Sequence, residues 1–230
     1  MAQSHFEAAG LKSLLVGSPA EARALVVVLH GYAMRPEDLE PFAHSMRSPV
    51  LFCFPQAPQT AIPDGYAWWT IDNERRTRQL AVGARDLVNE SPDGRAALRA
   101  QLNEFVGCLR QQQNLSAPLV LGGFSQGGMM ACDAVLHGAL EVAGLVLMSS
   151  SRIAIEEWST QRQALQDLPV LVSHGRQDTD LAFAAGEALR DFHIASGARV
   201  TWQPFEGGHE IPLVVWRALR RFLQEIARLT

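Results

Sequence analysis

The sequence predicts a three-layer α/β domain with a mostly parallel central sheet and no large cap domain. Apolar runs rich in β-branched residues alternate with amphipathic helical patterns along the 230 residues, which is typical of parallel strands joined by right-handed helical crossovers. Residues capable of chemistry directly follow several of these runs, as expected where ligands bind at the carboxyl ends of strands. No linker divides the chain, so we expect a single domain over residues 1–230.

The strands are predicted from continuous apolar runs, which are typical of strands covered on both faces. The clearest runs are Leu25–Leu29, Pro118–Leu121, Leu145–Met148 and Val170–Val172, with a further candidate at Val50–Phe54. Leu11–Val16 and the more amphipathic Arg199–Trp202 are expected at the edges of the sheet. About twenty residues (149–168) separate two of the predicted strands, too few for a cap domain in addition to a helix.

Helices are predicted between the strands from apolar residues at helical spacing. Pro36 suits the first turn of a helix that continues to Met46, because proline at this position loses no hydrogen bond. Ser91 and Pro92 are expected as N-cap and first residue of a helix through Leu109. One further predicted helix is Asp180–Ala195, with Asp180 as its N-cap. The last predicted helix buries one apolar face, formed by Val215, Leu219, Phe222, Leu223 and Ile226.

Composition excludes several classes of protein. A hydrophobic content of 47% is typical of a globular chain, and no segment approaches the roughly 18 apolar residues that span a bilayer. The N-terminus lacks the basic and apolar parts of a secretory signal, so we expect a cytoplasmic protein. A net charge of −4 does not indicate the basic surface that nucleic-acid binding requires. Cys53, Cys108 and Cys132 are odd in number and lie in apolar patterns, which predicts buried free thiols.

Ser125 is the candidate nucleophile. Residues 123–127 read Gly-Phe-Ser-Gln-Gly, a G-x-S-x-G pattern in which the serine occupies a strained strand-to-helix turn that requires small neighbours. The helix that begins there directs its unpaired N–H groups and the positive end of its dipole toward any negative charge beside Ser125. This arrangement suits acyl transfer, in which a carbonyl oxygen becomes an oxyanion.

A serine hydroxyl needs a base within hydrogen-bond reach and an acid that orients the base. His209 is the predicted base, because it lies in a glycine-flanked loop between the last strand and the last helix. His30 and His174 each end a strand before glycine, so we expect them to fix loops by hydrogen bonding. The other four histidines lie in the N-terminus or in helical patterns: His5, His44, His137 and His193.

Asp178 is the predicted acid, because it lies in the turn after a central strand. The nearby Asp180 is better placed to cap a helix. The chain order Ser125, Asp178, His209 is the order of nucleophile, acid and base in hydrolases built on a parallel α/β sheet.

Two backbone N–H groups are predicted to bind the oxyanion, those of Gln126, directly after the nucleophile, and Tyr32, in the loop after an early strand. The alternative for Tyr32 is a partly buried aromatic residue, and the two roles are compatible because only its backbone is needed. Trp68, Trp69 and Met129 are candidates for an acyl-binding site, although such residues are more often ordinary core.

Two other motifs fail on spacing. Gly122–Gly127 imitates the start of a phosphate-binding loop, but Gly128 occupies the position of the required lysine. His209-Glu210 begins a zinc-protease motif, but Leu213 occupies the position of the second histidine. We therefore expect neither a nucleotide nor a metal site.

Six motifs together resemble the phospholipase/carboxylesterase family, which includes the acyl-protein thioesterases. They are His30-Gly31-Tyr32, Phe54-Pro55-Gln56-Ala57-Pro58, Trp68-Trp69, Gly123-Phe124-Ser125-Gln126-Gly127-Gly128, His174-Gly175-x-x-Asp178 and Gly207-Gly208-His209-Glu210-Ile211-Pro212. The resemblance extends from about Leu25 to Trp216. It implies a cofactor-free serine hydrolase of the α/β-hydrolase fold with Ser125, Asp178 and His209 as its triad. One departure is Ala33, where the family commonly has glycine.

The resulting hypothesis is a carboxylesterase that acts on a small-molecule ester through an acyl-enzyme on Ser125. A thioesterase or a lysophospholipase is the alternative within the same chemistry. A catalytically idle binding protein with this fold is the alternative from another class, but it would not need all three residues at the correct loops. The natural substrate and the oligomeric state are not readable from the sequence.

Overall fold

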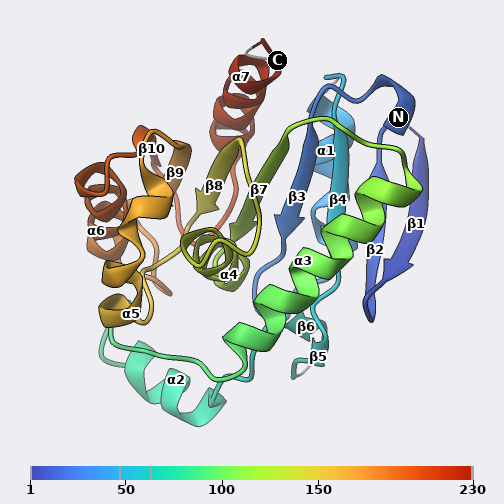
Figure 1. The fold of residues 1–230 in the computed structure, drawn as a ribbon. Coiled ribbons are helices and arrows are strands. Elements are labelled where there is room, and N and C mark those ends of the chain that lie inside the picture. The colour runs from blue at the N-terminus through green and yellow to red at the C-terminus, as the bar shows by residue number, and fades with distance from the viewer. Residues whose placement is uncertain (1, 47, 63, 229–230) are drawn as a thin grey trace.

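The computed structural model describes residues 2–46, 48–62 and 64–228, and its centre is an eight-stranded sheet in the order β1-β2-β4-β3-β7-β8-β9-β10 (Figure 1). The strands from β4 to β10 are parallel, while β1 and β2 pair antiparallel at one edge. The predicted mostly parallel α/β fold is confirmed. The strands are β1 Gln3–Ala8, β2 Leu11–Val16, β3 Leu25–Leu29, β4 Leu51–Pro55, β7 Leu119–Phe124, β8 Gly144–Met148, β9 Pro169–Gly175 and β10 Arg199–Phe205.

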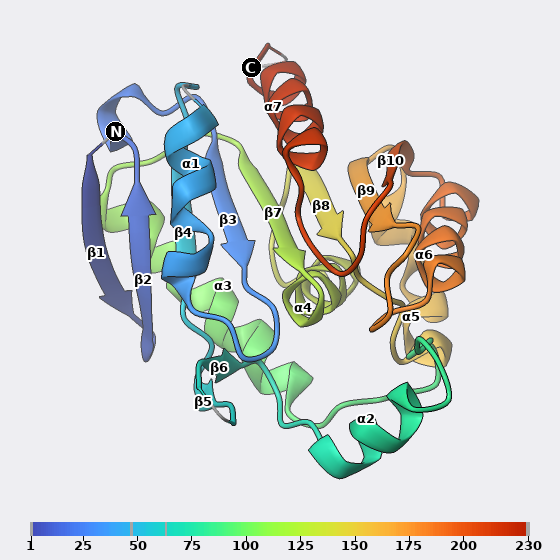
Figure 2. The ribbon, with the colours of Figure 1, turned by 180° about the vertical axis from the view of Figure 1, so that it is seen from behind.

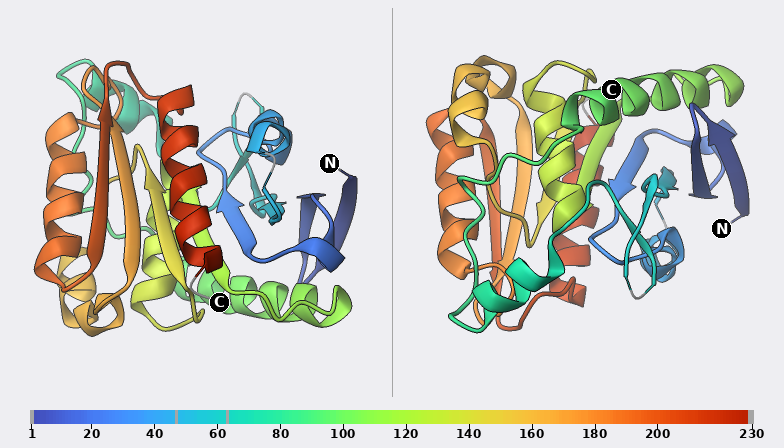
Figure 3. Two further views of the ribbon diagram at one scale, coloured as in Figure 1. Left: turned by 90° about the horizontal axis from the view of Figure 1, so that it is seen from above. Right: turned by 90° about the horizontal axis from the view of Figure 1, so that it is seen from below.

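Helices cover both faces of the sheet, which explains the continuous apolar runs. Leu25, Val27 and Leu29 of β3 point into the core beneath α3, α4 and α6, while the alternate residues of β3 face α1 and α7. Figure 2 shows α1 and α7 in front of the sheet, and the right panel of Figure 3 shows α3 and α1 on opposite sides of it. The longer helices are α1 Glu40–Met46, α2 Asn73–Leu80, α3 Arg95–Gln112, α4 Gln126–Leu136, α5 Ile155–Thr160, α6 Phe183–Ala195 and α7 Leu213–Arg228.

Three predicted helix starts are wrong. A short 3-10 turn, Pro36–Asp38, precedes α1. Helix α3 begins at Arg95 after Gly94 (φ 80°), so Ser91 and Pro92 remain in the loop before it. Helix α6 begins at Phe183, and Asp180 does not cap it because its carboxylate pairs with two arginines described below.

Two short features were not predicted. Strand β1 places only Phe6 in the core, too few inward residues to mark a strand in the sequence. The hairpin of β5 (Gln59–Thr60) and β6 (Tyr66–Ala67) lies in what reads as a proline-rich loop.

The cysteines are unpaired, as predicted. Cys53 and Cys132 are buried, whereas Cys108 is only half-buried. Burial raises the pKa of the Cys53 thiol to about 12, so this thiol stays protonated near neutral pH. Within the described ranges, no helix is both long and apolar enough to cross a bilayer.

Candidate active site

Ser125 lies between β7 and α4 in a strained conformation, with φ 52° and ψ −117°. Only small neighbours permit this turn. A Cβ at Gly127 would lie 2.1 Å from the Leu29 oxygen, and a Cβ at Gly123 would lie 2.3 Å from the carbonyl carbon of Gly127. The glycines of the G-x-S-x-G motif are therefore required by the close approach of β3, β7 and α4.

Three loops at the carboxyl ends of the parallel strands bring Ser125, His209 and Asp178 together. The Nε2 atom of His209 lies 3.0 Å from Ser125 Oγ, and its Nδ1 atom lies 2.7 Å from Asp178 Oδ2. The Phe124 ring packs against the imidazole at 4.8 Å between centroids. This is the geometry in which a serine hydroxyl can pass its proton to an oriented imidazole.

The Asp178 carboxylate is buried and receives several hydrogen bonds. Its Oδ1 atom accepts the backbone N–H groups of Asp180 at 2.8 Å and Leu181 at 2.9 Å. Its Oδ2 atom faces His209 and also lies 3.3 Å from Nε2 of His174. Burial by itself would raise the pKa of Asp178, but hydrogen bonds from His174 and His209 outweigh it and hold the pKa well below its usual range. Asp178 is therefore ionised near neutral pH.

His30 holds the loop beside Ser125, as the sequence predicted. Its Nδ1 atom donates to the Gly31 oxygen at 2.8 Å, and its Nε2 atom accepts the backbone N–H of Ala57 at 3.0 Å. Burial lowers the pKa of His30, which keeps the ring neutral in this role. His193 is also buried, and burial lowers its pKa to about 4.

Gln126 and Tyr32, the two predicted oxyanion donors, line the same cavity as Ser125. Gln126 is the first residue of α4, so its backbone N–H has no acceptor within the helix. The side chain of Gln126 is buried and accepts the N–H of Trp68 at 2.9 Å while donating to the Trp69 oxygen at 2.9 Å. The phenol of Tyr32 instead meets the Asn73 side chain, 3.1 Å away. Tyr32 lines the cavity beside Ser125, and its hydroxyl is engaged by Asn73.

The departure at Ala33 has a physical meaning in the structure. Ala33 adopts φ 59°, a left-handed conformation that glycine reaches without strain and alanine does not. The β5–β6 hairpin holds the loop in place, because the Ala33 N–H donates to the Tyr66 oxygen at 2.9 Å. A Cβ at Gly65 would lie 2.4 Å from the Ala33 oxygen, so hairpin and loop pack closely.

A cavity of about 540 Å³ opens beside Ser125. The predicted residues Trp69 and Met129 line it, and so do Ile153 and Leu181, which were not predicted. These four buried apolar residues are called the apolar floor. Trp68 differs from the expectation. It does not line the cavity but is fully buried, and its indole N–H donates to the His30 oxygen at 2.9 Å.

Charged residues form the rim of this cavity, mostly on α2 and the loop that follows it. Helix α2 lies beyond the arrowheads of the parallel strands (Figure 2) and has no buried side chain. Ion pairs hold it: Arg75 meets Glu90 at 2.5 Å, and Arg76 joins Arg85 on the carboxylate of Asp180. Arg75, Arg76 and Arg78 lie close together in the sequence, and Arg75 and Arg76 line the cavity. The charged lining residues are Asp72, Arg75, Arg76, Arg85, Glu90, Asp93 and Asp180.

Among the described residues, no group of three histidine, cysteine or acidic side chains is arranged to hold a metal ion.

Comparisons with known proteins agree on one family and one fold. The profile of the phospholipase/carboxylesterase family matches residues 13–227. Acyl-protein thioesterase 1 of Neurospora crassa is 25% identical to the chain, over 92% of this chain and 90% of that protein. Acyl-protein thioesterase 1 of Gibberella zeae is 26% identical, over 78% of this chain and 77% of that protein.

Solved structures with similar folds include esterase PE8, with a TM-score of 0.75 at 27% identity over 92% of this chain and 97% of that chain. Acyl-protein thioesterase 2 of Zea mays has a TM-score of 0.74 at 16% identity, over 94% of this chain and 98% of that chain. At that identity the second likeness concerns the fold alone.

Proposed function

This chain belongs to the phospholipase/carboxylesterase family and is a hydrolase, and we propose that it cleaves carboxylic esters through an acyl-enzyme formed on Ser125. The observation that carries the proposal is the continuous chain of hydrogen bonds from Ser125 Oγ through both nitrogens of His209 to Asp178. The strained backbone of Ser125 supports it further, because such strain persists where the surrounding structure holds a functional residue in place.

In the proposed reaction, His209 Nε2 takes the hydroxyl proton as Ser125 Oγ attacks the ester carbonyl. The tetrahedral intermediate collapses, His209 gives the proton to the departing alcohol, and Ser125 is left acylated. Water then attacks the acyl-enzyme with His209 again as base, which releases the acid and restores Ser125. Asp178 keeps the imidazole oriented and stabilises its charged form throughout.

The oxyanion of each intermediate is proposed to accept hydrogen bonds from the backbone N–H groups of Gln126 and Tyr32. The position of Gln126 at the start of α4 supports its part, because the helix dipole adds to the donor. The neighbouring N–H groups of Ala33 and Met34 are already used by the carbonyls of Tyr66 and Gly31, which favours Tyr32 as the second donor of this loop.

For the substrate, we propose that the acyl group lies on the apolar floor formed by Trp69, Met129, Ile153 and Leu181. Covering this floor with an acyl chain would favour binding by a free energy proportional to the apolar area removed from water. The charged rim then faces the polar parts of the substrate.

A thioester is the second candidate substrate, because both curated relatives are named acyl-protein thioesterase 1. The same acyl-enzyme chemistry serves both, with a thiol in place of the alcohol as leaving group. We further propose that residues 1–230 form one domain; the cytoplasmic location and the absence of a nucleic acid partner stay predictions from the sequence.

A fluorophosphonate probe and a substrate panel test this function. The probe should label Ser125 in the wild type and leave Ser125→Ala unlabelled, with the labelled peptide identified by mass spectrometry. A panel of paired esters and thioesters with acyl chains of increasing length should then be hydrolysed by the wild type only. Absence of labelling together with absence of turnover would favour the non-catalytic binding protein.

A further inference from the structure

A second imidazole, that of His174, lies against the proposed catalytic acid. His174 is near the end of β9 and is completely buried. Its Nε2 atom lies 3.0 Å from the Leu181 oxygen and 3.3 Å from Asp178 Oδ2. The acid therefore contacts two histidines, of which only His209 reaches Ser125.

The chemistry of these partners determines where the proton of His174 resides. The Leu181 carbonyl and the ionised Asp178 carboxylate are both acceptors without a hydrogen. Nε2 must therefore carry the proton and share it between the two oxygens. The opposite nitrogen, Nδ1, is buried without a hydrogen-bond partner among the described residues, as an unprotonated nitrogen can be at lower cost than a buried N–H group.

The surroundings leave the ring little freedom. A Cβ at Gly186 of α6 would lie 2.4 Å from His174 Nδ1, so α6 packs directly on the imidazole. The Phe183 ring contacts the imidazole edge-on, with 6.2 Å between the ring centroids. The Arg176 guanidinium lies over the Phe183 ring, 4.9 Å from its centroid. Strand β10 places Pro204 opposite His174 in the sheet. Among the described neighbours, Asp178 is the one charged group in direct contact.

We propose that His174 is a positioning residue for catalysis, a neutral imidazole whose Nε2–H group fixes the orientation of the Asp178 carboxylate toward His209. This proposal rests on the function proposed above and extends it to a fourth side chain. His174 also donates to Leu181, whose own N–H donates to Asp178 Oδ1. The imidazole therefore contacts Asp178 directly, and it also holds Leu181, whose N–H group bonds to the same carboxylate.

Two substitutions separate positioning from simple packing. His174→Leu removes the N–H donor and fills the site with an apolar side chain. His174→Gln keeps a side-chain N–H group near the position of Nε2. His193→Leu is the matched control, because His193 is equally buried but bonds to Leu189 and Cys132 on the helical face. Folding of each variant is checked by thermal melting before its kinetics are compared.

For His174→Leu we expect kcat to fall about 10-fold to 100-fold with KM unchanged, the range of a lost hydrogen bond to a charged group. The acid limb of the kcat/KM profile should also move to higher pH. With one donor lost, more of the negative charge on Asp178 acts on His209, which then holds its proton to higher pH. His174→Gln should restore kcat to within a few-fold, and His193→Leu should alter stability without moving kcat or the pH profile.

A ¹⁵N NMR measurement on the wild type tests the proposal without relying on turnover. The His174 resonances, assigned by their loss in His174→Gln, should show a neutral ring protonated at Nε2. A proton on Nδ1 would overturn the proposal, as would a wild-type kcat and pH profile in His174→Leu. If Ser125 is not labelled while the Nε2 tautomer is found, the proposed function fails and the contact between His174 and Asp178 stands.

Discussion

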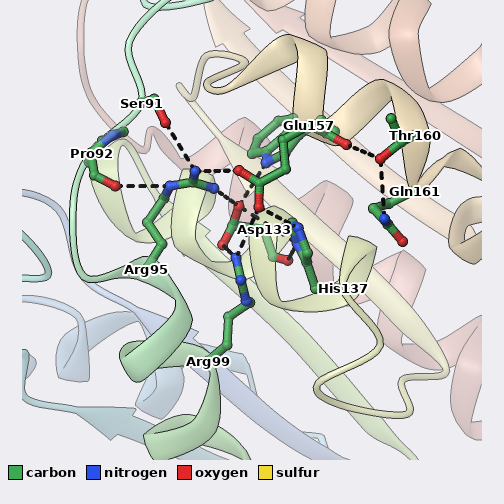
Figure 4. Close-up of polar contacts among 10 residues, drawn as sticks. Ser91, Pro92, Arg95, Arg99, Asp133, His137, Glu157, Thr160 and Gln161 are labelled. Carbon is green, nitrogen blue, oxygen red and sulfur yellow. Dashed lines mark hydrogen bonds and ion pairs between the residues drawn. The ribbon is translucent and has the colours of Figure 1, made fainter.

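Asp178 and Asp133 are two completely buried carboxylates that the fold uses in different ways. Asp178 accepts hydrogen bonds from two backbone N–H groups and faces two histidines at the ends of the strands. Asp133, in the middle of α4, meets Arg95 at 2.5 Å, Arg99 at 2.7 Å and the indole N–H of Trp158 at 2.8 Å (Figure 4). Both acids are satisfied, but Asp178 lies against two imidazoles, whereas the shortest contacts of Asp133 are to two guanidinium groups, which keep their charge.

The network around Asp133 joins three helices with permanent charges. Glu157 of α5 accepts from Arg95 at 2.5 Å and lies 2.7 Å from His137 of α4. Burial alone would lower the pKa of Arg95, but hydrogen bonds and charges from Glu157 and Asp133 raise it above its ordinary value. A guanidinium that never deprotonates can brace helices but cannot relay a proton. The comparison therefore predicts that damage at Asp178 affects rate and damage at Asp133 affects stability.

The largest expected effect is the loss of the nucleophile or the base. Ser125→Ala and His209→Ala should each lower kcat by about 10⁴-fold to 10⁶-fold, and the double variant should be little worse, because the two residues act as a unit. Steady-state kinetics on an activated ester measure this, with thermal melting as the control for folding. Additive losses in the double variant would contradict the assignment.

Asp178→Asn should lower kcat by about 10⁴-fold, because the amide favours the wrong tautomer of His209. Its neighbour Asp180 provides the matched control within the same loop. Asp180→Asn should mainly loosen α2 through the contacts with Arg76 and Arg85, and leave kcat on a small ester within a few-fold. Equal losses at both positions would leave the acid unassigned.

Asp133→Asn should lower stability and leave kcat unchanged, the opposite of what is expected for Asp178→Asn. Removing the charge leaves Arg95 and Arg99 partly uncompensated in a buried site, which costs about 3–5 kcal/mol of unfolding free energy. Among the molecules that remain folded, kcat should equal that of the wild type. Urea denaturation measures the unfolding free energy. The maximal rate divided by the concentration of active sites, titrated with the fluorophosphonate, gives kcat. A kcat loss without a stability loss would remove the distinction between the two acids.

The sequence predicted which segments form the strands, but β7, β9 and β10 each continue three residues beyond their predicted ends, to Phe124, Gly175 and Phe205. It could not predict the long-range partners. Ser125 and Asp178 follow apolar runs and His209 follows the more amphipathic edge strand, so parallel topology is sufficient to bring them to one edge of the sheet. Arg95 as the first residue of α3 opposes the helix dipole and looks unfavourable in isolation, because its partners lie on α4 and α5. Tertiary pairing overrode the local capping signal of Ser91 and Pro92.

Adjacent residues illustrate the same limit within the site. Trp68 and Trp69 read alike in sequence, yet the first is core and the second lines the cavity. The backbones of Trp68 and Trp69 are held by hydrogen bonds to the Gln126 side chain, which is 58 and 57 positions away, respectively. Similarly, the residues near Asp180 in the sequence do not predict its partners, because Arg76 and Arg85 lie 104 and 95 positions away.

Acid should weaken the contribution of Asp178 to stability. Its folded pKa lies below the ordinary value of about 3.9, so its contribution is complete above that value and is lost as the pH falls toward the folded pKa. The difference in unfolding free energy between wild type and Asp178→Asn should therefore be constant above about pH 5 and shrink below about pH 4. Urea titrations at several pH values measure it. A difference that grows on acidification would contradict the lowered pKa.

The smallest expected effects come from one strained alanine in each region. Ala33 in the proposed oxyanion loop has φ 59°, and Ala154, which precedes α5 and its Glu157, has φ 43°. Glycine relieves about 1–2 kcal/mol of left-handed strain but gains freedom in the unfolded chain, so each substitution should stabilise by about 1 kcal/mol or less. Only Ala33→Gly lies beside the reacting atoms, so only it should change kcat, by at most a few-fold, because the hairpin still holds the Ala33 N–H. Equal changes of kcat in Ala33→Gly and Ala154→Gly, measured on the same ester, would show that catalysis responds to general flexibility and not to the path of the oxyanion loop.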